Sequence, residues 1–268
     1  MASEMTTQYA ERLLKLTEGW PADAEVNGLN DLLRAASRWR SHLLANTFVH
    51  EQGARIWSGP FAGMEYVTQA SEGALIPRLL GTYESELHPH LNALVEQGLD
   101  CVIDVGCAEG YYAVGLARMA PQTTVYAYDI DERARLACAD LAARNGVAER
   151  VIVGGEFAPD GFEAFAGRRV LVLVDAEGAE LDILQPALSP ALSGMNVIVE
   201  THDVYRPGAL LTMIERFAPT HDIVRVDQAP KVFDPPAWFH KLAHLDQLLA
   251  VWEWRAKPTP WLVMRPKL

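Results

Sequence analysis

The sequence predicts an α/β fold built around a mostly parallel β-sheet. Beyond residue 100, short apolar runs typical of strands alternate with segments of helical periodicity, and this alternation builds βαβ units. The run Val-Leu-Val-Leu-Val at residues 170–174 is apolar throughout, as expected of a central parallel strand covered on both faces. A glycine-rich turn at residues 106–110 joins the first apolar run to a helix. Sheets of this kind bind ligands at the carboxyl ends of their strands.

The predicted elements follow one another closely after residue 100. The helix at residues 132–144 is the best marked, because Asp131 can cap its start and Gly146 follows its end. Another helix is expected at residues 111–119, directly after the glycine-rich turn. The expected strands cover residues 101–105, 124–128, 150–153, 170–174, 196–199, 222–226 and 261–264.

Residues 1–97 differ in character, and we expect them to form a cap on a domain that spans residues 98–268. Apolar residues at helical spacing predict an amphipathic helix from about residue 30 to residue 48. Strand-like runs on both sides of the turn at residues 58–63 predict a hairpin. The polar face of the helix, which we expect to be solvated, carries Arg34, Arg38 and Arg40.

Composition limits the class of partner. The chain has 268 residues, with 23 Lys plus Arg against 35 Asp plus Glu and a formal net charge of −12. Binding of nucleic acid requires basic surface, so we expect no nucleic-acid partner. Half of the residues are hydrophobic, which is enough for a sizeable packed core.

The sequence also argues against a membrane partner. No stretch approaches the roughly 18 consecutive apolar residues of a membrane span, and residues 1–20 lack the pattern of a signal peptide. Cys101, Cys107 and Cys138 are odd in number and lack metal-ligand spacing, which indicates reduced thiols. We therefore expect a soluble, cytoplasmic protein. The oligomeric state is undetermined, with a homodimer as one option.

The turn after the first predicted strand has the composition of a ligand cradle. Gly106 and Gly110 let the backbone approach a ligand, and the following helix offers free backbone N–H groups. The dinucleotide fingerprint GxGxxG, started at Gly106, would require glycine where this chain has Ala108 and Tyr111. This mismatch weakens an NAD-binding interpretation. An ordinary strand-to-helix turn is the other alternative.

A signal for adenosine follows the next predicted strand. Asp129 ends the run at residues 124–128, where its two carboxylate oxygens can accept hydrogen bonds from vicinal ribose hydroxyls. Ile130 can pack on an adenine ring, and Glu156 with Phe157 can bind the edge of the ring. A solvated Glu156 is the alternative. Asp129 would serve NAD equally well, so it favours adenosine without selecting the cofactor.

The most distinctive segment is the acidic stretch D-x-E-G-A-E-L-D-x-L at residues 175–184. Together with D-x-G-x-A-x-G at residues 104–110, it resembles the FkbM-type branch of class I S-adenosylmethionine-dependent methyltransferases over residues 100–203. That branch commonly has an asparagine where this chain has Ala108-Glu109, and glutamate-proline where this chain has Asp129-Ile130. The departures leave the class intact but put the substrate in doubt.

The resemblance implies a Rossmann-like class I methyltransferase fold, with a mostly parallel seven-stranded sheet and an antiparallel last strand. It also implies S-adenosylmethionine as cofactor and methylation of an oxygen on a small metabolite or sugar. The residues assigned to the cofactor by the motifs and by the resemblance are Glu84, Asp104, Gly106, Cys107, Ala108, Gly110, Tyr111, Asp129, Ile130, Glu156, Phe157 and Asp175.

Two further segments are placed near the substrates by this resemblance. In many class I methyltransferases the segment before the first strand covers the cofactor, which would bring Tyr83 and Glu84 to its methionine end. The start of a surface helix is the alternative. Residues 228–260, rich in Pro and Trp, interrupt the connection between the last two predicted strands. Because long loops in compact domains are often functional, we expect an insertion that forms a substrate lid, or else core for the cap.

Transfer of a methyl group to a neutral hydroxyl requires removal of the hydroxyl proton. His202, just after the strand at residues 196–199, is the candidate base because imidazole titrates near neutral pH, and Glu200 or Asp203 would orient it. A hydrogen-bonded scaffold histidine is the alternative. Asp175, Glu200 and His202 could instead hold a divalent cation, as in metal-dependent O-methyltransferases, but we predict no metal.

Two other functions stay open at this point. An NAD-dependent oxidoreductase would bind NAD and not S-adenosylhomocysteine. A non-catalytic module would bind S-adenosylmethionine without transferring its methyl group to any acceptor. The sequence identifies neither the acceptor nor the methylated atom.

Overall fold

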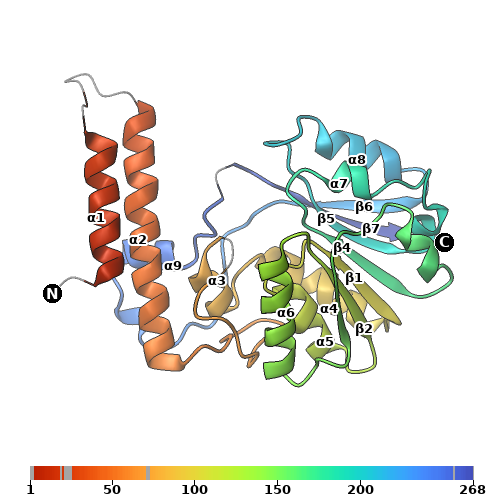
Figure 1. Ribbon diagram of the computed structural model, residues 1–268, viewed down its shortest axis with the longest axis horizontal. Coiled ribbons are helices and arrows are strands. Elements are labelled where there is room, and N and C mark those ends of the chain that lie inside the picture. The colour runs from red at the N-terminus through yellow and green to blue at the C-terminus, as the bar shows by residue number, and fades with distance from the viewer. Residues whose placement is uncertain (1–2, 19, 21–25, 71–72, 256, 268) are drawn as a thin grey trace.

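The structure is a computed structural model in which a helical hairpin stands beside an α/β body (Figure 1). The predicted cap includes residues 1–2, 19, 21–25 and 71–72, and the predicted insertion includes residue 256, all outside the described part of the chain. The structure describes residues 3–18, 20, 26–70, 73–255 and 257–267.

The body is organised around a seven-stranded sheet with the strand order β3-β2-β1-β4-β5-β7-β6. Strands β1 to β5 pair in parallel, whereas β7 is antiparallel to both of its neighbours, β5 and β6. The predicted fold class is therefore confirmed, including the antiparallel last strand. The strands are β1 (Cys101–Val105), β2 (Thr124–Tyr128), β3 (Val151–Gly154), β4 (Val170–Val174), β5 (Asn196–Glu200), β6 (His221–Val226) and β7 (Trp261–Pro266).

Helices cover both faces of this sheet, and the apolar strands pack against them on each side (Figure 1). Leu171 of β4 belongs to the apolar core on one face and Val172 to the core on the other, because successive side chains of a strand point to opposite faces. Every residue of β4 is buried, as predicted for a central strand. One face carries α4 (His88–Glu96), α5 (Tyr111–Met119) and α6 (Glu132–Arg144), and the other carries α7 (Glu180–Ile183) and α8 (Ala209–Phe217).

The predicted boundaries in the body agree with the structure to within two residues. Helix α6 begins after Asp131, whose side chain accepts a hydrogen bond of 2.9 Å from the Arg133 N–H and so caps the helix. Its last turn is followed by Gly146, which has a φ of 67°. The local signals for this helix therefore act as expected.

The amino-terminal part contains two long helices, α1 (Glu4–Thr17) and α2 (Val26–Gln52), which run antiparallel (Figure 1). The lower half of α2 lies against α9 (His244–Ala250) and α3 (Leu75–Leu80). The predicted hairpin is present in reduced form, with one isolated antiparallel bridge between Arg55 and Glu65. Within the described ranges, no helix is both long enough and apolar enough to span a lipid bilayer.

The arginines of α2 differ from one another in environment. Arg34 is exposed, as expected, but Arg40 pairs with Asp246 of α9 at 2.6 Å. Arg38 lies over the Trp254 ring at 5.3 Å from the ring centre. The expectation of a common solvated face is therefore wrong for Arg38 and Arg40, because α2 packs against the carboxy-terminal segment on that side.

Candidate functional site

A cavity of about 880 Å³ opens at the carboxyl ends of the parallel strands. This is within the usual size range of small-molecule sites, roughly 300–1,000 Å³. Arg38 of α2 and part of the insertion also contribute to its wall. The lining residues of the insertion are Glu253, Trp254, Arg255, Lys257 and Thr259. The residues that follow the strands and line the cavity include Gly106, Ala108, Asp129, Ile130, Glu156, Phe157, Asp175, Glu177, His202 and Tyr205.

The strand order places the cavity where the chain changes direction across the sheet. From β1 the chain builds outward to β2 and β3 and then returns to place β4 on the other side of β1. Loops diverge at such a point, which is where open α/β sheets bind their ligands. Gly106 has a φ of 87°, and a Cβ atom there would lie 1.8 Å from the Asp175 carbonyl oxygen. Only glycine fits this close approach of two loops.

One end of the cavity is built from the loops after β1, β2 and β3. Asp129 accepts backbone hydrogen bonds from Ala108 at 2.9 Å and from Asp131 at 2.8 Å, so its carboxylate is held in place. Each carboxylate oxygen can accept more than one hydrogen bond, which leaves capacity for a ligand. Ile130 is 83% exposed, whereas Phe157 is buried and its ring packs on Tyr128. These residues can surround a nucleoside.

Behind this end of the cavity, Asp104 of β1 is 1% exposed, and neither carboxylate oxygen has a hydrogen-bond partner among the described residues. Burial raises the pKa of Asp104 to about 7, and the nearby Asp129 carboxylate adds to the increase. Buried polar atoms are almost always paired in folded proteins. The backbone N–H of Ala113 opposes the increase in pKa, and the carboxylate lies beneath the glycine-rich turn, outside the lining of the cavity.

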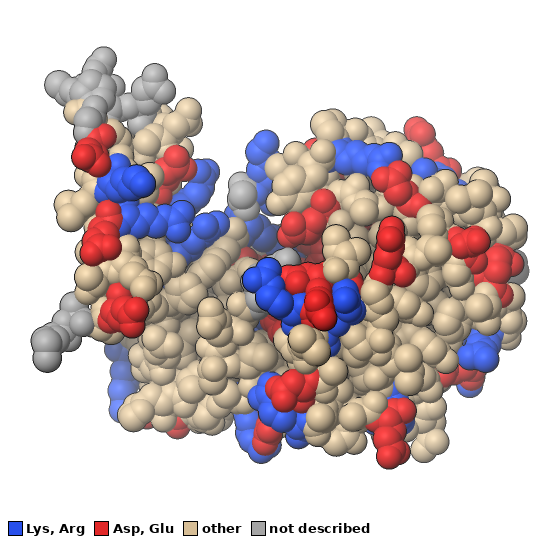
Figure 2. Space-filling model, viewed as in Figure 1, with Lys and Arg blue, Asp and Glu red and all other residues tan. Residues whose placement is uncertain are grey.

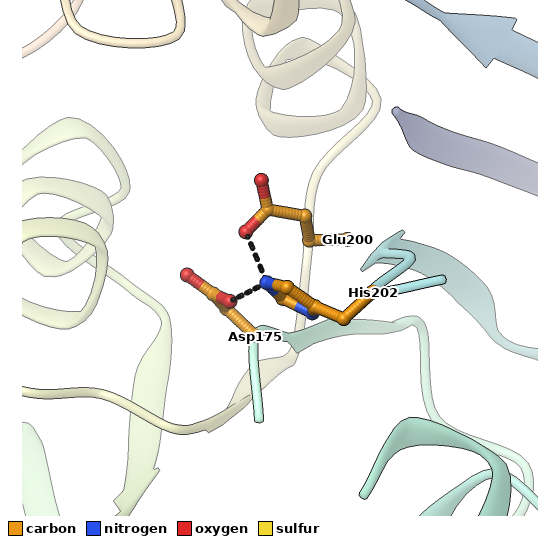
Figure 3. Close-up of side chains that lie close together, drawn as sticks. All are labelled: Asp175, Glu200 and His202. Carbon is orange, nitrogen blue, oxygen red and sulfur yellow. Dashed lines mark ion pairs between the residues drawn. The ribbon is translucent and has the colours of Figure 1, made fainter. Parts of the chain in front are cut away.

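At the other end of the cavity, His202 lies among three carboxylates, two of which, Asp175 and Glu200, are drawn in Figure 3. Its Nε2 atom is 3.2 Å from Glu200 Oε2 and 3.7 Å from Asp175 Oδ1. Its Nδ1 atom is 2.6 Å from Glu180 Oε1, on the side away from the two residues drawn in Figure 3. Asp175 and Glu200 extend from the ends of the adjacent strands β4 and β5, which brings them together.

The charges of this cluster depend on one another. Although burial opposes the change, hydrogen bonds to Glu180 and Glu200 raise the pKa of His202 to about 10. Burial also opposes the low pKa of Glu200, which His202 and Arg255 hold at about 2. Burial and the carboxylates of Glu200 and Glu84 raise the pKa of Asp175 well above its usual range. At neutral pH His202 is therefore a cation that donates both of its N–H groups.

Arg255 joins the insertion to this cluster. Its guanidinium forms ion pairs with Glu84, Glu200 and Glu253, and its side chain is only 13% exposed. Burial and the Glu200 carboxylate raise the pKa of Glu84 to about 7, against the opposing effect of Arg255. Lys231 of the insertion pairs with Glu253 at 2.5 Å. Residues from both ends of the insertion thus meet beside the strand ends.

Strained backbone conformations gather around the cavity. Four non-glycine residues in the described ranges have positive φ angles, a conformation that costs of order 1–3 kcal/mol and is enriched at functional sites. Three of them line the cavity, and the fourth pairs with Arg255. They are Ala108, Glu177, Trp254 and Glu84.

The structure separates the predicted residues into two groups. All three candidates for catalysis, Asp175, Glu200 and His202, line the cavity and lie together. Of the predicted cofactor residues, seven line it: Gly106, Ala108, Asp129, Ile130, Glu156, Phe157 and Asp175. Another five lie outside its lining: Glu84, Asp104, Cys107, Gly110 and Tyr111.

The roles of Asp203, Glu180 and Arg255 were not expected from the sequence. Asp203 does not orient His202 but accepts hydrogen bonds from the backbone of Gly208 and Leu210 at the start of α8. Glu180, a residue of the acidic motif, takes that role. Arg255 carried no sequence signal, because an isolated arginine in a loop has no characteristic spacing.

Comparisons with known proteins give the following findings. No protein-family model and no curated protein sequence matches this chain. Among solved structures, it is similar to the O-methyltransferase TomG from Streptomyces achromogenes, involved in tomaymycin synthesis and solved with S-adenosylmethionine, at 14% identity and a TM-score of 0.46 over 100% of both chains. An O-methyltransferase from Bacillus cereus in complex with S-adenosylhomocysteine gives 16% identity and a TM-score of 0.45 over 66% of this chain and 79% of its own.

A third solved structure has a different kind of substrate. It is an rRNA methylase from Streptococcus thermophilus, with 16% identity and a TM-score of 0.45 over 68% of this chain and 96% of its own. Similarities at this level identify neither the family nor the substrate of the present chain. The functional argument therefore depends on the residues of the cavity.

Proposed function

We propose that this chain is an S-adenosylmethionine-dependent methyltransferase of the FkbM-type branch that methylates a hydroxyl oxygen of a small metabolite or sugar. The observation that carries the proposal is one cavity whose wall includes both Asp129 with the glycine-rich turn and the cluster of Asp175, Glu200 and His202. The first end suits the binding of a nucleoside, and the second suits removal of a proton from an acceptor hydroxyl. The acidic motif at residues 175–184, which carries the resemblance, supplies both Asp175 and Glu180.

In this proposal the cofactor lies along the ends of β1, β2 and β3. S-adenosylmethionine supplies a methyl group on a positively charged sulfur, which an oxygen nucleophile attacks in line. Asp129 accepts hydrogen bonds from the ribose hydroxyls, and Phe157 and Ile130 flank the adenine. The unpaired carboxylate of Asp104 stabilises the turn and the positively charged amino group of the methionine part.

The cluster of Asp175, Glu200 and His202 can act on the acceptor in two ways. In the first, His202 is the general base. An acceptor hydroxyl loses its proton to Nε2 as the oxygen forms its bond to the methyl carbon, and S-adenosylhomocysteine leaves. A pKa of about 10 keeps His202 protonated at neutral pH, so the base role requires it to lose that proton first. This role therefore predicts a rate that rises with pH toward 10.

The second way is a divalent cation held by Asp175, Glu200 and His202. It is favoured by the geometry, because one ligand atom from each residue lies within 4.8 Å of the other two. Two carboxylates and an imidazole suit Mg²⁺, Mn²⁺ or Zn²⁺, and a bound cation lowers the pKa of a hydroxyl that coordinates it. The chain's part is then to hold the three ligands, with Glu180 fixing the imidazole through Nδ1.

We also propose that residues 1–97 form a cap and that residues 228–260 form a lid over the acceptor. The contacts of Arg255 with Glu200 and of Trp254 with Arg38 support this assignment, because they join both segments to the cavity wall. A cap and a lid would exclude water from the reacting atoms.

The test is methyl transfer from labelled S-adenosylmethionine to a panel of hydroxylated small molecules, with and without chelator. We expect a labelled product and stoichiometric S-adenosylhomocysteine. Loss of turnover with EDTA and its return with Mg²⁺ or Mn²⁺ would assign the cation; EDTA-resistant turnover that rises with pH would assign His202 as base. Cofactor binding with no turnover on any acceptor would indicate a binding module instead.

A further inference from the structure

Two cations on the cavity wall have no carboxylate partner in the part of the chain that the structure describes. The wall includes Arg38, Arg78, Arg255 and Lys257. Arg255 is paired with three glutamates, and Arg78 pairs with Glu109 at 3.4 Å. By contrast, neither Arg38 nor Lys257 forms an ion pair with any residue in the described ranges. This is unexpected in a chain with a net charge of −12, where carboxylates are plentiful.

Arg38 is held in place by an aromatic ring. Its guanidinium lies 5.3 Å from the centre of the Trp254 ring, a cation–π contact. Trp254 in turn donates a hydrogen bond of 3.2 Å to Ser41 Oγ and contacts the His42 ring edge-on. The ring is therefore fixed on both sides, and the arginine that it supports is pre-positioned.

The guanidinium of Arg38 donates no hydrogen bond to any residue that the structure describes. Its Nε atom is buried and has no hydrogen-bond partner among the described residues. A buried donor without a partner is costly, by about 1–3 kcal/mol, unless a ligand satisfies it. Trp254 also has a φ of 66°, so this tryptophan is held in a strained conformation at the cavity wall. An anion bound by the guanidinium would use the donors that Arg38 leaves without a partner among the described residues.

The two cations lie on the side of the cavity formed by the helical hairpin and the insertion. Figure 2 shows Lys and Arg side chains on both sides of the hollow between the hairpin and the body. The strand ends on the opposite wall carry carboxylates, including Asp129, Asp175 and Glu200. An anion is repelled from that wall and attracted to the basic one, which would orient a ligand that carries both an acidic group and a hydroxyl.

We propose that the acceptor is an anion whose carboxylate or phosphate group binds Arg38, with Lys257 on the same cavity wall adding electrostatic attraction. Its hydroxyl then points to the cluster of Asp175, Glu200 and His202. This inference rests on the proposed function for the identity of the reaction, but the anion site itself is independent of methyl transfer. The arginine presents a planar fork for two oxygens, and the lysine adds a mobile charge at the exposed edge.

The test measures binding to the whole chain, saturated with S-adenosylhomocysteine and also free of it, by ligand-observed NMR and calorimetry. The probes are two matched pairs: para-hydroxybenzoate with para-hydroxybenzamide, and glucose 6-phosphate with glucose. The first pair differs in charge at nearly constant shape, and the second differs by the presence of the phosphate group. The two pairs distinguish a carboxylate from a phosphate. We expect the anionic member of at least one pair to bind about tenfold more tightly than the neutral member.

The variants locate the effect. Arg38→Met and Lys257→Met should each reduce the preference for the anion, to less than about threefold for Arg38→Met, without changing the affinity for S-adenosylhomocysteine. Arg34→Met is the matched control, because Arg34 lies one turn earlier on α2, is exposed and pairs with Asp31. It should keep the preference of the unaltered chain. Thermal unfolding of each variant checks that the fold is intact.

The outcomes separate this inference from the proposed function. Absence of any preference for an anion, including no binding of either anionic probe, overturns the inference, as does a preference that survives Arg38→Met. Neither result affects the proposed function while S-adenosylhomocysteine binds. Failure of S-adenosylhomocysteine to bind overturns the proposed function alone, because the anion preference is also measured without it.

Discussion

The two ends of the cavity are built in different ways. The end at β1, β2 and β3 consists of short loops that directly follow strands, and its main carboxylate, Asp129, is held by nearby backbone N–H groups. The end at β4 and β5 consists of titratable side chains buried against one another. There Arg255 reaches Glu200 and Glu84 across long separations in the sequence.

This difference has an energetic consequence. At the first end, the Asp129 carboxylate is partly exposed to the cavity and accepts backbone N–H groups, so its charge is compensated locally, whereas Asp104 behind it is a buried carboxylate. A buried cluster of carboxylates and cations costs desolvation free energy, which is offset only while every partner is present. Substitutions at the first end should therefore lower the affinity for a ligand with little loss of stability. Substitutions at the second end should reduce both turnover and the free energy of unfolding.

The largest expected effect is at His202. His202→Ala should reduce turnover by about 10²–10⁴-fold, because it removes the base or a metal ligand. The affinity for S-adenosylhomocysteine, measured by calorimetry, should change by less than about threefold. His240→Ala is a control, since His240 is exposed and does not line the cavity. Unchanged turnover in His202→Ala would remove this residue from the mechanism.

Next in size is the removal of the buried cation. Arg255→Met should lower the free energy of unfolding by about 3–5 kcal/mol, because Glu84, Glu200 and Glu253 would lose their shared partner. Urea denaturation measures the change. Arg225→Met, which breaks an exposed pair with Asp227, should cost at most about 1 kcal/mol. Equal effects of the two substitutions would show that the buried cluster contributes no more to stability than an exposed ion pair, contrary to the account of the second end.

The buried cluster should also make stability depend on pH. The pKa of His202 is raised from 6.5 to about 10, so its contribution is complete below pH 6.5 and is lost as pH rises through 10. The pKa of Glu84 is raised from 4.5 to about 7, so its contribution to stability is also lost as the pH rises. The free energy of unfolding should therefore be about 1–3 kcal/mol lower at pH 9 than at pH 6. His202→Ala should reduce this difference, and an unchanged slope in that variant would exclude His202 as its source.

The smallest effect concerns the other end of the cavity. Asp129→Asn should weaken binding of S-adenosylhomocysteine about tenfold, because the ribose hydroxyls would lose a charged acceptor. The stability of the protein without ligand should change little. Glu132→Gln, on the exposed first turn of α6, is the matched control and should leave the affinity unaltered. Wild-type affinity in Asp129→Asn would place the ribose elsewhere.

The two ends of the cavity also differ in how far they could be predicted from the sequence. The strand ends, the glycine-rich turn and Asp129 are local features, since a turn and the strand before it are contiguous in the chain. The contacts of His202 with Glu180 and of Arg255 with Glu200 join residues 22 and 55 positions apart. They depend on how loops pack after the sheet has formed, and spacing alone does not encode that. The raised pKa of His202 follows from those contacts and was equally beyond sequence reasoning.

The central claim is that the cavity binds the adenosine of S-adenosylmethionine at the ends of β1 and β2. The most direct test is calorimetric titration of the purified protein with S-adenosylhomocysteine and, separately, with NAD. We predict micromolar binding of S-adenosylhomocysteine alone, a free energy of about −8 kcal/mol, weakened in Asp129→Asn. Binding of NAD without S-adenosylhomocysteine would contradict the claim and would make this chain a candidate oxidoreductase instead.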